Sequence, residues 1–237
     1  MKSALSAIAS LCIALILILG VIVLLGWKRA SDLAANELSK KLKVNVAIGG
    51  ISGDINTIIV DNIEIDNPEG SHLPQAFICD KMTITAAASQ YLQQDVVIDS
   101  IVLDGVYVDL EFDSKRGKQG NWSTIMNNAY NASIELKNEK SGKVPTDDAV
   151  RTVLVRHLIL TNISTDLVYR NKNTVEHLPS LDEIILKDLR SEGGSVRNQL
   201  VRLILSQTLK AVYEEQEIKH DLPGGRLRYL LPLRRLD

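Results

Sequence analysis

The chain has 237 residues, with 27 basic and 29 acidic side chains and a formal net charge of -2. A nearly neutral chain lacks the excess of basic side chains that nucleic-acid-binding proteins carry, so we predict no nucleic-acid partner. Hydrophobic residues make up 45% of the chain and aromatic residues only 4%, so the apolar content is mostly aliphatic.

The segment from Ala4 to Trp27 contains no charged residue and no proline. As a helix, this segment would be roughly 36 Å long, enough to cross a hydrocarbon core of about 30 Å. A cleaved secretory signal usually has an apolar region of about 7–15 residues, so the length favours a retained transmembrane helix over 4–27 after a short tail over 1–3. Trp27, Lys28 and Arg29 are then expected at the membrane interface.

Residues 28–43 are predicted to form an amphipathic juxtamembrane helix, with Leu33, Leu38 and Leu42 among charged and small residues. More basic residues follow the apolar segment than precede it. The charge rule alone would therefore place the main domain in the cytoplasm.

From residue 44 the apolar residues recur with a period of two, which predicts a β-rich domain over 44–221. Segments 58–66, 82–86, 96–104 and 106–113 are read as antiparallel strands, separated by turns such as Asn67-Pro68 and Asp104-Gly105. Apolar and polar residues alternate in 106–113, which predicts that this strand has one buried and one solvent-exposed face. Further strands are expected at 151–160, 164–169 and 181–189. The predicted fold class is α+β: a transmembrane helix, then a mostly antiparallel, curved β-sheet with a few amphipathic helices.

Three other segments have a different character. A polar connection near 115–150 is expected to be mobile, with one helical turn around 123–132. A helix is predicted after Ser195. The tail over 222–237 is basic and apolar, which is typical of a segment that contacts a membrane surface or a partner. Its candidate contact residues are Arg226, Arg228, Arg234 and Arg235.

A short pattern recurs in the predicted strands. Hexapeptides that start at Asn62, Ser100, His157 and Glu183 share the order polar, aliphatic, variable, aliphatic, polar and turn-forming residue. Their spacing is not constant, so the pattern indicates recurrent strand and turn chemistry rather than a solenoid.

Four features together resemble the amino-terminal module of AsmA-like proteins: Ser52-Gly53, the strand that ends in Asn67-Pro68, the predicted hairpin from Ile101 to Leu110, and Gly117 or Gly120 with Asn121-Trp122. Residues 180–207 resemble the end of such modules. The resemblance implies a Gram-negative inner-membrane protein with its main domain in the periplasm and a role in outer-membrane biogenesis. It also implies a relation to bridge-like lipid-transfer proteins, whose sheets curl into an apolar groove.

An apolar sheet face open to ligand is the candidate functional site. Aliphatic side chains suit acyl chains, which are bound through buried area rather than ring geometry. An ordinary closed core, covered by the helix after Ser195, would give the same pattern. The candidate groove residues are Ile63, Ile65, Ile101, Leu103, Val106, Val108, Leu110, Phe112, Leu158 and Leu160.

No catalytic constellation is visible, so we predict no enzymatic activity, no metal and no cofactor. The histidines lie in separate segments without a partner at helical spacing, and Asp99, Asp104 and Asp109 are read as turn and solvent-face carboxylates. Two functional hypotheses remain. One is a lipid-binding or lipid-transport protein with membrane lipid as its partner. The other is a structural or assembly factor that docks another envelope protein, or a second copy, through a sheet edge or the C-terminal tail.

Overall fold

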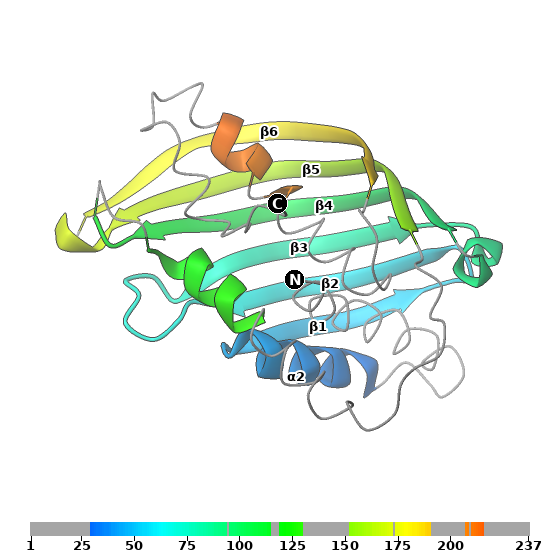
Figure 1. Ribbon diagram of the computed structural model, residues 1–237, viewed down its shortest axis with the longest axis horizontal. Coiled ribbons are helices and arrows are strands. Elements are labelled where there is room, and N and C mark those ends of the chain that lie inside the picture. Colours follow the sequence, from blue (N-terminus) through cyan, green and yellow to red (C-terminus); the bar gives the residue numbers. More distant parts are fainter. Residues whose placement is uncertain are drawn as a thin grey trace, which may run out of the picture.

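A computed structural model describes residues 29–93, 95–114, 119–129, 152–172, 174–190, 207–208 and 210–215. The described strands form one six-stranded sheet in the order β1-β2-β3-β4-β5-β6 (Figure 1). Residues 121–129, 207–208 and 210–215 are also helical. The named elements are α2 (Ala30–Leu42), β1 (Val46–Gly53), β2 (Thr57–Asp66), β3 (Gln75–Thr85), η2 (Ala88–Leu92), β4 (Asp95–Phe112), β5 (Thr152–Tyr169), η3 (Arg170–Lys172) and β6 (Thr174–Arg190).

The sheet is mixed, because β4 and β5 run parallel whereas the other neighbouring strands pair antiparallel. Parallel neighbours cannot be joined by a tight turn, since the chain must return to the end of the sheet where the first strand begins. The connection between Phe112 and Thr152 makes this return, and β4 and β5 are then paired along nearly their whole length.

The predicted fold class is wrong. Within the ranges that the structure describes, no helix is both long enough and apolar enough to span a membrane. The segment from Ala4 to Trp27, to which the transmembrane helix was assigned, lies outside those ranges. The sheet was predicted to be mostly antiparallel; four of its five strand pairs are antiparallel, and the β4–β5 pair is parallel.

Two predicted turns are interruptions within continuous strands. Asp104-Gly105 does not form a hairpin, because β4 passes straight through it for 18 residues. The segments predicted at 151–160 and 164–169 likewise belong to the single strand β5. β6 begins at Thr174, earlier than the predicted strand at 181–189. The last predicted helix is described only in its final part, at 207–208 and 210–215, and the predicted mobile loop only at 119–129.

A row of residues that interrupt the strand pairing crosses the sheet at this level. In each strand one residue of the row is left out of the pairing, while the register of neighbouring strands is the same on both sides of it. Three of these residues have positive φ: Asn62 at 51°, Gly105 at 64° and Asn162 at 53°. Asn and Gly tolerate this conformation at lower cost than other residues. We call this set the bulge row, and its members are Gly49, Asn62, Asp80, Gly105, Asn162 and Asp182.

The bulge row shifts the side-chain alternation in all six strands at once. In β4, buried side chains are two residues apart on either side of the row but three apart across it, from Leu103 to Val106. β5 shows the same step from Leu160 to Ile163. Because neighbouring strands shift together, one face of the sheet stays apolar from end to end.

Helix α2 closes the β1 edge of the sheet. The Ser39 hydroxyl accepts a hydrogen bond of 2.9 Å from the Val46 backbone N–H and lies 3.4 Å from the Val46 carbonyl. An unpaired edge strand is a template for pairing with another chain, and a covering helix removes that hazard. Asn128, from helix 121–129, donates a bond of 3.0 Å to the Leu42 carbonyl and so joins the two helices.

Candidate functional site

One face of the sheet, which we call the apolar face, carries aliphatic side chains in rows that cross the strands. Registered pairs connect Ile101 on β4 with Leu158 on β5, and Leu103 with Leu160. Two such rows end on β6. One starts on β2 and reads Ile58-Ile84-Ile101-Leu158-Leu186. The other starts on β1 and reads Ile51-Val60-Met82-Leu103-Leu160-Ile184.

All ten groove candidates predicted from the sequence belong to this face. Ile63 is partly buried, and the other nine side chains are at most 5% exposed. They come from β2, β4 and β5. The prediction missed the members from β3, of which Phe77, Cys79, Met82 and Ile84 are buried on the same face. These buried residues of β3 are two apart on either side of Asp80 but three apart across it, so a strict period of two does not connect them.

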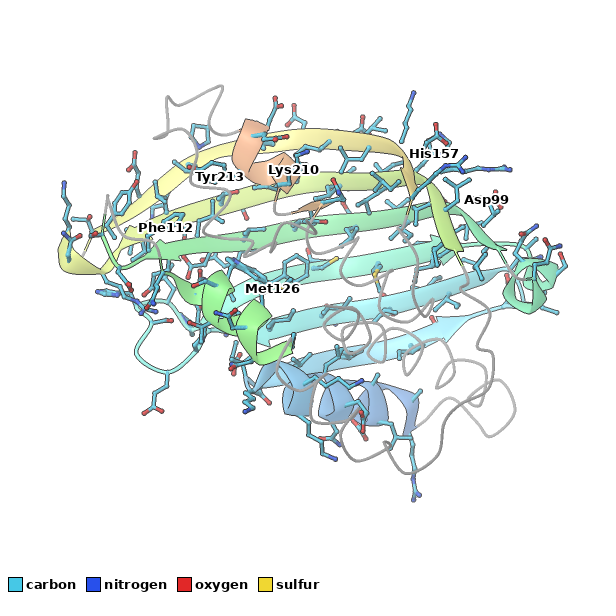
Figure 2. All side chains as sticks on the ribbon, in the orientation of Figure 1. Asp99, Phe112, Met126, His157, Lys210 and Tyr213 are labelled. Carbon is cyan, nitrogen blue, oxygen red and sulfur yellow. The ribbon has the colours of Figure 1, made fainter. Side chains whose placement is uncertain are left out.

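Short helices lie on the apolar face. Helix 121–129 contributes buried Trp122 and Met126, and the segment 210–215 contributes buried Val212 and Tyr213 to the same cluster of buried residues. Both helices lie in front of the sheet in Figure 1, and Figure 2 labels Met126 and Tyr213 on them. An 18-residue strand is about 60 Å long, whereas a nine-residue helix extends only about 14 Å. The described helices therefore contact only part of this face.

The two margins of the apolar face differ. At β1, the inward residues Val46, Ile48 and Ile51 are buried. At β6, Leu178 and Leu181 on the same face are also buried, whereas the later inward residues are only partly buried; they are Ile184, Leu186 and Leu189. The 184–189 part of β6 is therefore the stretch of the two described margins at which this face is most accessible.

Asn121 bonds to the edge of β4 that faces β3, beyond the point where β3 pairs with it. The β3–β4 ladder ends at Val108, so the backbone groups beyond it need other partners. The Asn121 side chain accepts a bond of 3.1 Å from the Glu111 N–H and donates one of 2.9 Å to the Asp109 carbonyl. The Trp122 indole N–H donates a further bond of 2.8 Å to the same carbonyl. The Asn-Trp motif therefore extends the sheet in place of a strand.

Asp109 lies at the centre of a buried polar network on the opposite face. Asn67 donates a bond of 2.7 Å to its Oδ2, and Asn121 lies 3.2 Å from the same oxygen, whereas Oδ1 is buried without a partner. Burial raises the pKa of Asp109 to about 7, the negative charges of Glu111 and Asp166 act in the same direction, and the Asn67 bond opposes the shift. The prediction that Asp109 is a solvent-face carboxylate is therefore wrong.

Glu111 ties the 67–74 loop to the end of β5. Its side chain is fully buried and forms an ion pair with the Arg170 guanidinium. The backbone N–H of His72 donates a bond of 3.0 Å to its other oxygen, and Arg170 also donates one of 3.0 Å to Ser71. The loop thereby covers the face of β4 on which alternation predicted only solvent-exposed residues.

Among the described residues, His157 and His177 each contact a group on a neighbouring strand. The exposed His177 ring lies 2.5 Å from Asp166, and the His157 ring lies 3.2 Å from the Asp99 carbonyl. Thr161 and Asn162 donate bonds of 2.6 and 2.7 Å to Asp104 and lower its pKa. In the described part of the chain, no group of three or more His, Cys, Asp or Glu side chains is placed to hold a metal ion.

The predicted membrane and tail contacts fall almost entirely outside the described residues. Arg29 is exposed and directly precedes α2, whereas Trp27 and Lys28 are not described. The same holds for the four tail arginines: Arg226, Arg228, Arg234 and Arg235.

No protein family model, curated protein sequence or solved structure matches this chain.

Proposed function

We propose that this chain binds the hydrocarbon chains of membrane lipids on its apolar face and acts in lipid binding or transport in the cell envelope. The observation that carries this proposal is the continuity of the aliphatic face across all six strands. Burying apolar area stabilises a complex by about 25 cal/mol per Å², and aliphatic rows parallel to long strands offer that area to an extended acyl chain. We place this activity at the inner membrane, on its periplasmic side, as the resemblance to AsmA-like proteins implies.

Two features support that resemblance. The Asn67-Pro68 and Asn121-Trp122 motifs, on which it depends, are joined by a bond of 2.8 Å from Asn121 to the Asn67 side chain. The strands before and between these motifs also share one aliphatic face. A non-enzymatic role is part of this proposal, because the polar side chains of Asn67, Glu111 and Asn121 hold loops and a strand edge together.

Photocrosslinking from neighbouring positions on β6 tests the proposal. Leu186 is half-buried on the apolar face, and the adjacent Lys187 is exposed on the other face. A benzophenone amino acid at position 186 is expected to form lipid adducts in membranes, detected by mass spectrometry, because it borders the accessible margin. The same group at position 187 is the matched control. Equal yields at the two positions, or no adduct at position 186, would contradict lipid binding on this face.

Docking through a sheet edge is the second candidate function, and the length of β6 favours it. This strand has 17 residues and is the last in the described sheet order. Proline lacks the backbone N–H, and charged side chains discourage edge pairing, so Pro179, Lys187 and Asp188 limit the length over which a second strand could pair. Ile185→Lys, at a 46% exposed position, should weaken such docking in a pull-down without changing the lipid adducts at position 186.

A further inference from the structure

One row of the apolar face contains a single polar residue. From β1 to β6 the row reads Val46-Ile65-Phe77-Val108-Thr165-Leu178, and each pair of neighbours is registered. All six side chains are buried, and Thr165 is only 1% exposed. A valine would have nearly the same shape, so packing alone does not require a hydroxyl here.

The Thr165 hydroxyl has no hydrogen-bond partner. Its Oγ1 is fully buried and unpaired, although threonine in a strand can usually find a backbone or side-chain partner. A buried, unsatisfied hydroxyl destabilises a folded protein, and such groups in native structures call for an explanation. A second unpaired buried hydroxyl is that of Thr208, in the helical residues 207–208.

We propose that Thr165 binds an uncharged oxygen of the lipid, such as an ester carbonyl, while the acyl chain follows the aliphatic rows along β4 and β5. This inference rests on the proposed function and adds the polar contact that the aliphatic rows lack. The path along β5 from Thr165 to Leu158 is about 23 Å, comparable with an extended palmitoyl chain.

The described strand residues around Thr165 offer no positive charge to a charged ligand group. No Lys, Arg or His occurs among the described strand residues on the apolar face. A carboxylate buried beside Val108 and Leu178 would therefore lack a counter-charge, and burying an unpaired charge is far more costly than burying a carbonyl that accepts one hydrogen bond. The site should prefer an ester to the free fatty acid.

The test compares three ligands with similar chains: methyl palmitate, palmitate and hexadecane. Each would displace phenylnaphthylamine, a fluorescent apolar probe, from the full chain in detergent solution. The wild-type chain should bind methyl palmitate about five-fold more tightly than hexadecane, as expected for one hydrogen bond, and palmitate more weakly than the ester. Thr165→Val should bind methyl palmitate and hexadecane equally, whereas Thr165→Ser should keep the preference.

Thr161→Val is the matched control, because Thr161 lies on β5 but donates its hydroxyl to Asp104 on the other face. It should keep the wild-type preference. Thermal unfolding of Thr165→Val should show stability equal to or above wild type, since the substitution removes an unpaired hydroxyl. An unchanged ester preference in Thr165→Val overturns the inference and leaves the proposed function standing. Failure of all three ligands to displace the probe from the wild-type chain overturns both.

Discussion

Asn121 donates a hydrogen bond of 2.8 Å to Asn67, which lies 54 positions earlier in the chain. The two amide side chains meet beside Asp109, where β3 no longer covers β4. Backbone groups that lose a strand partner must be satisfied by other means, and here amide side chains supply the missing donor and acceptor. The pair therefore fixes the 67–74 loop and the start of helix 121–129 to the same end of the sheet.

Replacing Asn121 with Ala should destabilise the domain by about 3 kcal/mol. The substitution leaves the Glu111 N–H buried without its partner, at about 1–3 kcal/mol. It also removes the bonds to the Asp109 carbonyl, which keeps its bond from Trp122, and to the Asn67 side chain, at about 1 kcal/mol each. Chemical denaturation would measure the change. Asn127→Ala is the control, because Asn127 lies in the same helix but is exposed, and it should change stability by less than about 0.5 kcal/mol. Equal losses in the two variants would refute the role of Asn121 at the strand edge.

Cys79 should resist thiol reagents in the folded protein. Its side chain is fully buried, its Sγ lies 3.3 Å from the Lys81 carbonyl, and burial raises its pKa to about 12, so very little reactive thiolate exists at pH 8. In a Cys12→Ser chain, labelling by a maleimide should follow the rate of unfolding and become fast in denaturant. Rapid labelling in native buffer would show that the apolar face opens at β3.

Alternation along single strands predicted which side chains are buried on the apolar face. Val106, Val108, Leu110 and Phe112 alternate with polar residues, and the structure buries all four. This information is local, because a side chain's face depends on its position in its own strand. The opposite face of the same segment was predicted less well. Glu111 is buried by the 67–74 loop and by Arg170, contacts that no local pattern encodes.

Strand ends and strand direction could not be predicted in the same way. Asp104-Gly105 has the composition of a tight turn, but an αL residue serves equally well in a bulge within a continuous strand. The choice between them depends on the neighbouring strands, which shift their alternation at the same level. Two of the four recurrent hexapeptides end in this row, at Gly105 and Asn162, both with positive φ. Asp188, which ends a third hexapeptide, also has positive φ but lies outside the row.

Gly105→Ala should destabilise the domain by about 2 kcal/mol or more. Gly105 has a φ of 64°, and an added Cβ would overlap the Asp80 carboxylate on the neighbouring strand. Both the unfavourable backbone conformation and the overlap oppose the substitution. Thermal unfolding would measure the loss, and Asp80→Ala in the same chain should recover part of it by removing the overlap.

Gly50→Ala is the matched control for the bulge row. Gly50 also lies in a strand, but its φ is not in the left-handed region and an added Cβ would have only the Asp61 carboxylate nearby, at 3.9 Å. The free energy of unfolding of Gly50→Ala should stay within about 0.5 kcal/mol of that of the wild-type chain. If Gly50→Ala cost as much as Gly105→Ala, the effect would reflect glycine in strands generally rather than the bulge.

Asp109 should make the domain less stable as the pH rises from about 4 to 7. The pKa of its carboxyl group is raised from 3.8 to about 7 in the folded chain, chiefly by burial. Over this interval the folded state holds a proton that the unfolded state has released, so the free energy of unfolding falls as the pH increases and levels off above 7. The full change is up to about 4 kcal/mol.

Asp109→Asn isolates this contribution, because Asn has the same shape and cannot ionise. The difference in free energy of unfolding between Asp109→Asn and wild type should grow in favour of the variant from pH 4 to pH 7 and stay constant above, as measured by urea denaturation at each pH. Other groups that titrate in this range are present in both chains, so their contributions cancel to first order. A difference that does not vary with pH would mean that Asp109 is ionised throughout this range, with its charge stabilised by the bonds from Asn67 and Asn121.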